Sequence, residues 1–165
     1  MGGDFAPRNV IIGVAEARRL LPEEVQLYLL GDKNKIAEIC SEENIDLGSF
    51  VIVHCSQAVD MGEHPVKAYV KKPDSSIVIG FKMLASGELD ALASAGNTGV
   101  MLVGCVQILK TIPGVHRPCI SIEVPMLNGD KMLLLDVGFN SDCRPEILVQ
   151  FAELGIVYSK TMMGV

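Results

Sequence analysis

Apolar residues in the first third of the chain follow two spacings, one typical of helices and one typical of buried strands. Residues 10–21 and 33–44 carry apolar side chains every three to four positions, which predicts two amphipathic helices. Residues 25–30 and 50–55 are short apolar runs, which predicts two buried strands. Strands that alternate with helices indicate a parallel sheet with right-handed crossovers.

The middle of the chain continues this alternation with shorter segments. Residues 66–72 and 77–85 have the composition of two short helices. Residues 89–95 predict a third buried strand, and residues 100–112 predict a helix that is buried almost all round, because few of its side chains are polar.

The last third has a different pattern. Residues 119–127 and 131–137 are two strand-like runs joined by Asn128-Gly129, a dipeptide that favours a type I′ hairpin turn. A helix follows over residues 145–163, with a proline in its first turn. The predicted fold class is therefore α/β, with a mostly parallel, doubly wound sheet and one antiparallel hairpin.

The order of these segments also bears on domain organisation. The 165 residues suit a single domain. The chain opens on a loop and a helix, whereas a ligand-binding loop in a doubly wound fold normally follows a strand. We therefore expect residues 1–165 to form one incomplete α/β domain, the N-terminal part of a longer enzyme that is truncated here at both ends.

Composition and charge narrow the classes of partner. The net charge is −6, and no basic stripe is visible, so a nucleic-acid partner is not expected. Five cysteines without framework spacing predict reduced, structural thiols in a cytoplasmic protein. No secretory signal and no apolar run long enough to span a bilayer is visible.

The segment Ser94-Ala95-Gly96-Asn97-Thr98-Gly99 is the first candidate site. Small residues let a backbone approach a ligand closely, and the free amides that begin a helix favour an anion. Hydroxyl and amide side chains add further donors, so the turn is expected to bind phosphate. The alternative is an ordinary turn with a threonine cap, and the lysine of a nucleotide-binding P-loop is missing.

Two further loops carry polar side chains. Asp4 lies in the Gly-rich loop before the first helix, where it either orients a ligand or complements the helix dipole. Asp136 and Asn140 follow an apolar strand and either line a ligand cleft or tie down their loop, while Asp142 is expected to cap the next helix. Arg117 either clamps an anion or forms a surface salt bridge.

Metal ligation is considered at Asp60, Glu63 and His64, which lie close together. Their spacing matches no metal signature, so an ordinary polar loop is expected there, with no metal and no cofactor. Lys71 and Lys72 either bind an anion or form a solvated helix end.

Taken together, the motifs resemble the phosphate acyltransferases of bacterial phospholipid synthesis, the acyl-ACP:phosphate transacylases, over essentially the whole chain. The resemblance is carried by the order and spacing of these segments: Met-Gly-Gly-Asp-Phe-Ala-Pro at 1–7, Leu-Leu-Gly-Asp at 29–32, Met-Gly-Glu-His-Pro at 61–65, Lys-Lys-Pro-Asp-Ser-Ser-Ile at 71–77, Ser-Ala-Gly-Asn-Thr-Gly at 94–99, Arg-Pro at 117–118, Leu-Asp-Val-Gly-Phe-Asn-Ser-Asp-Cys at 135–143 and Gln-Phe-Ala at 150–152.

The resemblance implies transfer of a fatty acyl group from acyl carrier protein to inorganic phosphate, by a homodimer that associates peripherally with the membrane. It also implies a fold similar to that of phosphotransacetylases and isopropylmalate dehydrogenases. Phosphate contacts are expected from Ser94, Gly96, Asn97, Thr98, Gly99 and Arg117, and catalytic roles from Asp4, Asn97, Asp136 and Asn140. The alternatives are a phosphotransacetylase-like enzyme that uses acyl-CoA, an NAD-dependent oxidoreductase, and a non-catalytic scaffold that binds acyl carrier protein.

Overall fold

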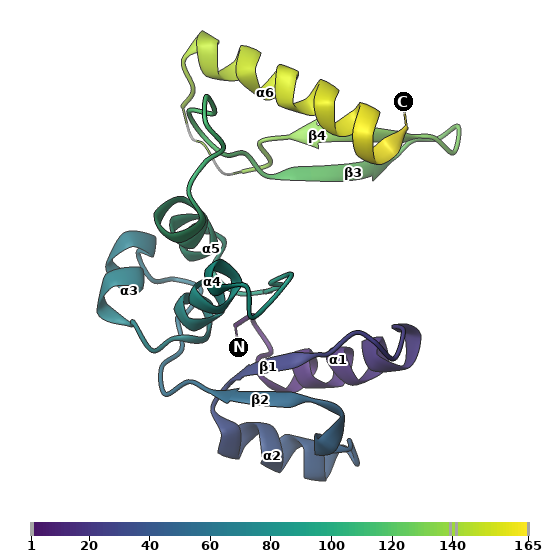
Figure 1. The fold of residues 1–165 in the computed structure, drawn as a ribbon, viewed down its shortest axis with the longest axis vertical. Helices are drawn as coiled ribbons and strands as arrows, with labels where there is room; N and C mark the ends of the chain where they lie inside the picture. Colours follow the sequence, from purple (N-terminus) through teal and green to yellow (C-terminus); the bar gives the residue numbers. More distant parts are fainter. Residues whose placement is uncertain (1, 139, 141, 165) are drawn as a thin grey trace. The chain divides into compact units, whose positions relative to one another are not determined.

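The computed structural model describes residues 2–138, 140 and 142–164. The chain divides into two compact units, the N-terminal unit Met1–Lys110 and the C-terminal unit Thr111–Val165. Each unit combines helices with a pair of strands (Figure 1). The α/β class is therefore confirmed, while the assignment of residues 1–165 to one domain stays a prediction.

The N-terminal unit begins with a helix, which is followed by a βαβ arrangement. Helix α1 (Arg8–Leu20) leads to strand β1 (Tyr28–Gly31), helix α2 (Lys33–Glu42), and strand β2 (Val51–His54) after a short 3₁₀ turn (Leu47–Ser49). β1 and β2 pair in parallel, as predicted. Their core consists of buried side chains from all four elements or their immediate ends: Ile11, Leu29, Ile36, Ile39, Cys40 and Phe50.

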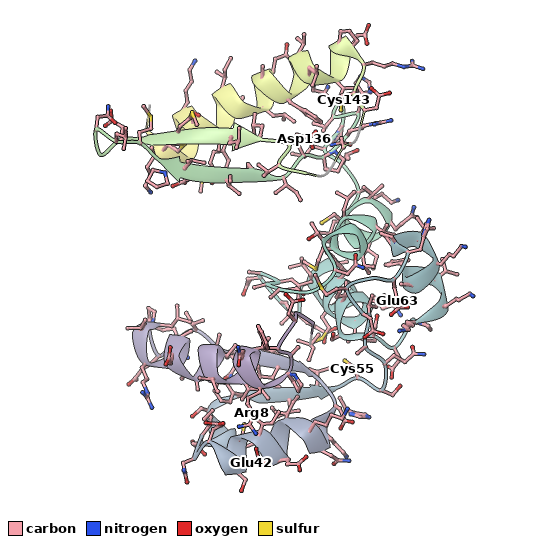
Figure 2. The ribbon with its side chains drawn as sticks, turned by 180° about the vertical axis from the view of Figure 1, so that it is seen from behind. Arg8, Glu42, Cys55, Glu63, Asp136 and Cys143 are labelled. Carbon is pink, nitrogen blue, oxygen red and sulfur yellow. The ribbon has the colours of Figure 1, made fainter. Side chains whose placement is uncertain are left out.

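Two sets of polar interactions hold the helices of this arrangement in place. The Asp32 carboxylate caps α2 by accepting hydrogen bonds from the Asn34 and Lys35 amides. Arg8 forms ion pairs with Glu42 and Glu43, which join the start of α1 to the end of α2; Figure 2 shows the Arg8 and Glu42 side chains near one another.

Three helices and a helical extension form the rest of the N-terminal unit. They are α3 (Pro65–Lys71), α4 (Ser76–Ser86), α5 (Thr98–Gly104) and a π-helical segment, η2 (Cys105–Leu109). Their core is a second group of buried side chains: Val59, Ala68, Ile77, Phe81 and Val100. The helices predicted at 66–72 and 77–85 are therefore confirmed within a residue or two.

The strand predicted at 89–95 is wrong. Residues 89–94 have no regular secondary structure, and no described segment pairs with them in a ladder. The apolar side chain of Leu92 instead packs beside Gly80 of α4 and Leu30 of β1. Leu89 and Leu92 are half-buried while the rest of residues 89–95 is exposed, so only these two leucines pack against the unit, without the backbone pairing that a strand requires.

The helix predicted at 100–112 is also only partly correct. It begins earlier, at Thr98, and its regular α-helical part ends at Gly104. The predicted burial almost all round is also wrong, because Val106 and Leu109 of the π-helical segment are 39% and 42% exposed.

The C-terminal unit is an antiparallel hairpin with one helix beside it. Strands β3 (Ser121–Pro125) and β4 (Lys131–Leu135) pair antiparallel, and α6 (Pro145–Tyr158) continues into a π-helical segment, η3 (Ser159–Met163). Figure 1 shows α6 lying along the hairpin. The contact is close, since a Cβ added to Gly155 of α6 would lie 2.6 Å from a Leu135 methyl carbon.

The hairpin turn differs from the predicted type I′ geometry. Among the turn residues only Gly129 has a positive φ, of 88°, whereas a type I′ turn requires a positive φ at Asn128 as well. The Gly129 amide donates to the Met126 carbonyl and the Met126 amide to the Asp130 carbonyl. This is a three-residue loop closed by a left-handed glycine, in which Asn128 bonds to Asp130 through its side chain.

Candidate functional site

The two Gly-rich segments predicted to form the site lie in direct contact within the N-terminal unit. A Cβ added to Gly2 would lie 2.8 Å from the Gly96 Cα. Gly3 has a φ of 121° and approaches the Ala95 carbonyl oxygen, which would lie 3.2 Å from an added Cβ. The two backbones therefore meet at a distance that only glycine allows. The first loop lies against the Ser94–Gly99 turn, which confirms that these segments are neighbours.

Asn97 is the structural centre of the turn. Its Oδ1 accepts a hydrogen bond from the Val100 amide at 3.1 Å, so Asn97 caps α5. Its Nδ2 donates to the carbonyls of Asp60, Met61 and Glu63 at 3.2, 3.0 and 3.1 Å. The side chain is 5% exposed, and its hydrogen-bonding capacity is used within the protein. The threonine cap of the alternative interpretation is wrong, since the capping residue is Asn97.

The other residues of the turn remain more open. The Ser94 hydroxyl accepts a hydrogen bond from the Gly96 amide at 3.1 Å, which narrows the turn. No described residue accepts a hydrogen bond from the backbone amides of Thr98 and Gly99. Gly99 packs against Pro65 so closely that an added Cβ would lie 2.4 Å from the Pro65 Cγ. Two donors therefore remain for an anion at the start of α5.

A pocket of about 450 Å³ lies beside these loops, entirely within the N-terminal unit. It opens where β1 and β2 end, the edge at which open α/β sheets bind ligands. Asp4 lies in its wall and is exposed. The described residues around it come from three segments: Gly2, Gly3, Asp4, Ala6 and Pro7; Gly31, Asp32, Lys35 and Ile36; and Cys55, Ser56, Gln57, Ala58, Val59, Asp60 and Met61.

The Asp60–Glu63 segment of the pocket wall is fixed on both sides. Besides the Asn97 bonds, Glu63 forms an ion pair with Lys72 and accepts from the Asp60 amide at 2.7 Å. Lys72 also donates to the Ala58 carbonyl at 2.7 Å. The Lys72 ammonium group holds the pKa of the Glu63 carboxyl below its ordinary value. Glu63 and Lys72 are therefore structural residues. Both were considered from the sequence, but their ion pair was not predicted.

The next segment of the wall is fixed by Asp74. Its carboxylate accepts hydrogen bonds from the Ser56 hydroxyl and from the Ser56 amide, the latter at 2.8 Å. These bonds lower the pKa of Asp74, with the hydroxyl bond as the main cause. Gln57 Oε1 in turn accepts from the Asp74 amide at 3.0 Å. The pocket edge is thus tied to the loop before α4.

We expect the stability of the N-terminal unit to fall in acid partly because of Glu63. Its lowered pKa stabilises the fold above the unfolded-state value of roughly 4.3, and this contribution is lost as the pH falls through the lower folded-state pKa. Measured by urea unfolding between about pH 3 and about pH 7, the free energy of unfolding should fall less steeply toward acid pH in Glu63→Gln than in the unmodified chain. Glu38→Gln, on the exposed surface of α2, is the matched control; equal acid limbs in both variants would contradict this assignment.

The thiols show the expected structural character. Burial raises the pKa of Cys40, Cys55, Cys105 and Cys119. Cys55 lies directly after β2, where Figure 2 labels it, and is 2% exposed. A high thiol pKa leaves little thiolate near neutral pH, which disfavours a nucleophilic role for these four residues.

Asp136 and Asn140 form a pair in the C-terminal unit. Asp136 has a φ of 58°, and its Oδ1 accepts from the Asn140 amide at 3.2 Å and from its side-chain Nδ2 at 2.7 Å. Asn140 Nδ2 also lies 3.4 Å from the Pro118 carbonyl oxygen. Asp136 therefore ties down its loop, which was one of the two interpretations, while a ligand-binding or catalytic role for this pair stays a prediction. Phe139 and Ser141 of the same motif lie outside the described residues.

Arg117 and Asp142 also belong to the C-terminal unit. Arg117 is exposed and donates from one guanidinium nitrogen to the Asp142 carbonyl at 3.4 Å. The expected Asp142 cap is wrong, because the residue at the N-cap position of α6 is Arg144, which makes no side-chain cap bond. Proline at the first helical position leaves this helix start with one fewer free amide. The cleft expected to combine these residues with Asp4 and the Ser94–Gly99 turn stays a prediction.

No helix in the described part of the chain is both long and apolar enough to cross a membrane. Within the same residues, no group of three or more histidine, cysteine or acidic side chains is arranged to hold a metal ion.

Comparison with known proteins gives a consistent assignment. A family model described as "Fatty acid synthesis protein" matches residues 1–165. Curated relatives named "Phosphate acyltransferase" include proteins from Caldicellulosiruptor bescii (40% identical over 164 residues), Bacillus licheniformis (39% over 165) and Desulforamulus reducens (42% over 164). The alignments cover 99%, 100% and 99% of this chain and 48% of each relative.

The chain thus spans about half the length of the curated relatives it matches. The match runs over the whole of the present sequence, including the Gly-rich loops that meet beside the pocket. The chain belongs to the fatty acid synthesis protein family that the matching model describes, alongside relatives named phosphate acyltransferases.

Proposed function

We propose that the protein is a phosphate acyltransferase, which moves a fatty acyl group from acyl carrier protein to inorganic phosphate and so produces an acyl phosphate for phospholipid synthesis. Family membership supports this proposal. The structural observation that supports it is the contact between Gly2-Gly3 and Ala95-Gly96, with the Thr98 and Gly99 amides open beside a 450 Å³ pocket.

The reaction requires no covalent bond between the protein and its substrates. Inorganic phosphate is itself a nucleophile near neutral pH, so no serine or cysteine nucleophile is required. The protein has to hold phosphate against the thioester carbonyl and stabilise the negative charge that develops on the carbonyl oxygen. Backbone amides in a preorganised turn suit both tasks, because they donate hydrogen bonds without moving during the reaction.

Within this proposal the residues take different roles. The Thr98 and Gly99 amides bind phosphate, with the Ser94 hydroxyl and the Gly96 backbone shaping the turn. Asn97 acts by holding the turn, since its side chain bonds to the protein itself. Four further residues are assigned to ligand contact within their own units: Asp4 in the N-terminal unit, and Asp136, Asn140 and Arg117 in the C-terminal unit.

The finer features of the fold and assembly are part of the same proposal. The parallel pair of strands and the antiparallel hairpin suit a doubly wound sheet of the phosphotransacetylase and isopropylmalate-dehydrogenase type. The protein is a cytoplasmic homodimer with peripheral membrane association. These statements rest on the resemblance set out above.

The direct test supplies acyl-[acyl carrier protein] and inorganic phosphate to the complete protein in which this sequence occurs. We expect acyl phosphate to form, detected as a radiolabelled lipid product when radiolabelled inorganic phosphate is supplied. A reaction of phosphate with acyl-CoA but not with the acyl carrier protein would replace the substrate assignment. Binding of the acyl carrier protein without any acyl phosphate would favour the scaffold.

We also expect the 165-residue chain to self-associate when it is produced alone. The C-terminal unit exposes large apolar side chains on both strands and on α6, and extensive exposed apolar surface promotes association. They include Ile122, Met132, Leu134, Leu148, Val149, Ile156 and Val157. Sedimentation velocity at increasing concentration checks this; a single monomer peak with cooperative unfolding would contradict it.

A further inference from the structure

We infer that the 450 Å³ pocket binds the neutral pantetheine arm of the acyl donor, while phosphate binds separately at the adjoining Ser94–Gly99 turn. This inference rests on the proposed function and divides its two substrates between two places in the N-terminal unit. The volume lies within the range of about 300–1,000 Å³ that is usual for small-molecule sites.

The charge of the pocket disfavours an anion. Its described lining carries three carboxylates, on Asp4, Asp32 and Asp60, against the single ammonium group of Lys35. A phosphate held there would face net repulsion in a partly desolvated site. A neutral ligand avoids that cost and can donate its own N–H and O–H groups to the carboxylates.

The remaining lining suits a chain of alternating amide and hydrocarbon groups. Gly2 and Gly3 are half-buried and carry no side chains, so part of their backbone stays accessible from the pocket. Val59 and Met61 supply apolar contacts for methyl and methylene groups. A fatty acyl chain fits less well, since burying it against these polar groups would leave them without hydrogen-bond partners.

The pocket and the turn share structural supports. Gly2 and Gly3 line the pocket and pack against Ala95 and Gly96 of the turn. Asn97 of the turn also reaches the pocket lining, because its Nδ2 donates to the Asp60 and Met61 carbonyls. Two substrate sites that share a wall can hold donor and acceptor in a fixed arrangement, which is what a transfer reaction needs.

Pantetheine occurs both on the acyl carrier protein and in coenzyme A, so the shared chemistry defines the ligand. The test uses free pantetheine, coenzyme A and holo-acyl carrier protein with the complete protein. The blocking variant is Ala58→Phe, which places a ring in the pocket wall. Its matched control is Ala85→Phe, on an exposed position of α4 away from the pocket.

We expect Ala58→Phe to raise the KM for the acyl donor by about tenfold or more, which corresponds to about 1.4 kcal/mol of lost binding. The KM for phosphate should change by less than about twofold, and pantetheine binding by calorimetry should be lost. Ala85→Phe should leave all three unchanged. A raised KM for phosphate alone, or unchanged pantetheine binding in Ala58→Phe, would overturn the inference. Of the two acyl donors, acyl-CoA and acyl-[acyl carrier protein], the one with the lower KM identifies the source of the pantetheine arm.

A second measurement needs no variant. In amide NMR spectra of the wild-type protein, pantetheine should shift the Gly31 and Ala58 signals, and inorganic phosphate those of Thr98 and Gly99. Pantetheine shifts without acyl phosphate formation would refute the proposed function and leave the pocket assignment standing. Acyl phosphate formation without pantetheine shifts at Gly31 and Ala58 would refute the pocket assignment alone.

Discussion

Replacing Gly104 with alanine is expected to destabilise the N-terminal unit by about 1–3 kcal/mol, the usual cost of overpacking a core. A Cβ at this position would lie 2.2 Å from the Phe81 Cδ2 and 2.4 Å from its Cε2. Phe81 is 2% exposed and lies among buried side chains, so the ring has little room to move. The change should therefore push α5 away from α4.

The matched control is Gly13→Ala in α1. Gly13 also lies inside a helix, yet an added Cβ would meet nothing within 4 Å. Because alanine has the higher helix propensity, this variant should gain about 0.5–1 kcal/mol. Urea unfolding followed by far-ultraviolet circular dichroism compares the two. If Gly104→Ala were as stable as Gly13→Ala, the close packing of α5 on Phe81 would be refuted.

Much of the N-terminal fold follows from sequence patterns that act locally. The periodic apolar residues of α1 and α2 and the apolar runs of β1 and β2 each specify one element, and these predictions are confirmed. Asp32 caps α2 through its own neighbouring amides, which is again a local interaction.

The errors arise where a distant partner decides the structure. Residues 89–95 are apolar enough for a strand, but Leu92 packs beside α4, and the segment finds no strand partner among the described residues. Apolar spacing reports burial, and cannot by itself distinguish burial against a helix from burial within a sheet. The turn at Asn128-Gly129 is a different case, because local side-chain bonds between Asn128 and Asp130 accompany a longer loop.

The candidate site, too, was predictable only where local sequence features mark it. Glycines and small polar residues marked both loops, and the contact of Gly2 with Gly96 brings those loops together. The pairing of Glu63 with Lys72 was less visible, because opposite charges nine positions apart meet only after α3 has formed. The role of Asn97 depends on the carbonyls of residues more than 30 positions earlier, which no local pattern reveals.

Replacing Asn97 with alanine is expected to cost about 2–4 kcal/mol. Loss of the cap on α5 accounts for about 1 kcal/mol. Leaving the Asp60, Met61 and Glu63 carbonyls without their shared donor adds about 1–3 kcal/mol. Asn97→Ser should be less harmful, because a serine hydroxyl can still cap the Val100 amide. Urea unfolding of both variants measures the two contributions.

The same variants separate a positioning role for Asn97 from direct contact with phosphate. If Asn97 acts by holding the turn to the Asp60–Glu63 segment, Asn97→Ser should weaken the use of phosphate and of the acyl donor together, because the turn and the pocket wall share this residue. A direct ligand would behave differently, with a raised KM for phosphate at unchanged stability and unchanged donor KM. That second pattern would return Asn97 to the phosphate-binding residues and show that its internal hydrogen bonds open when phosphate binds.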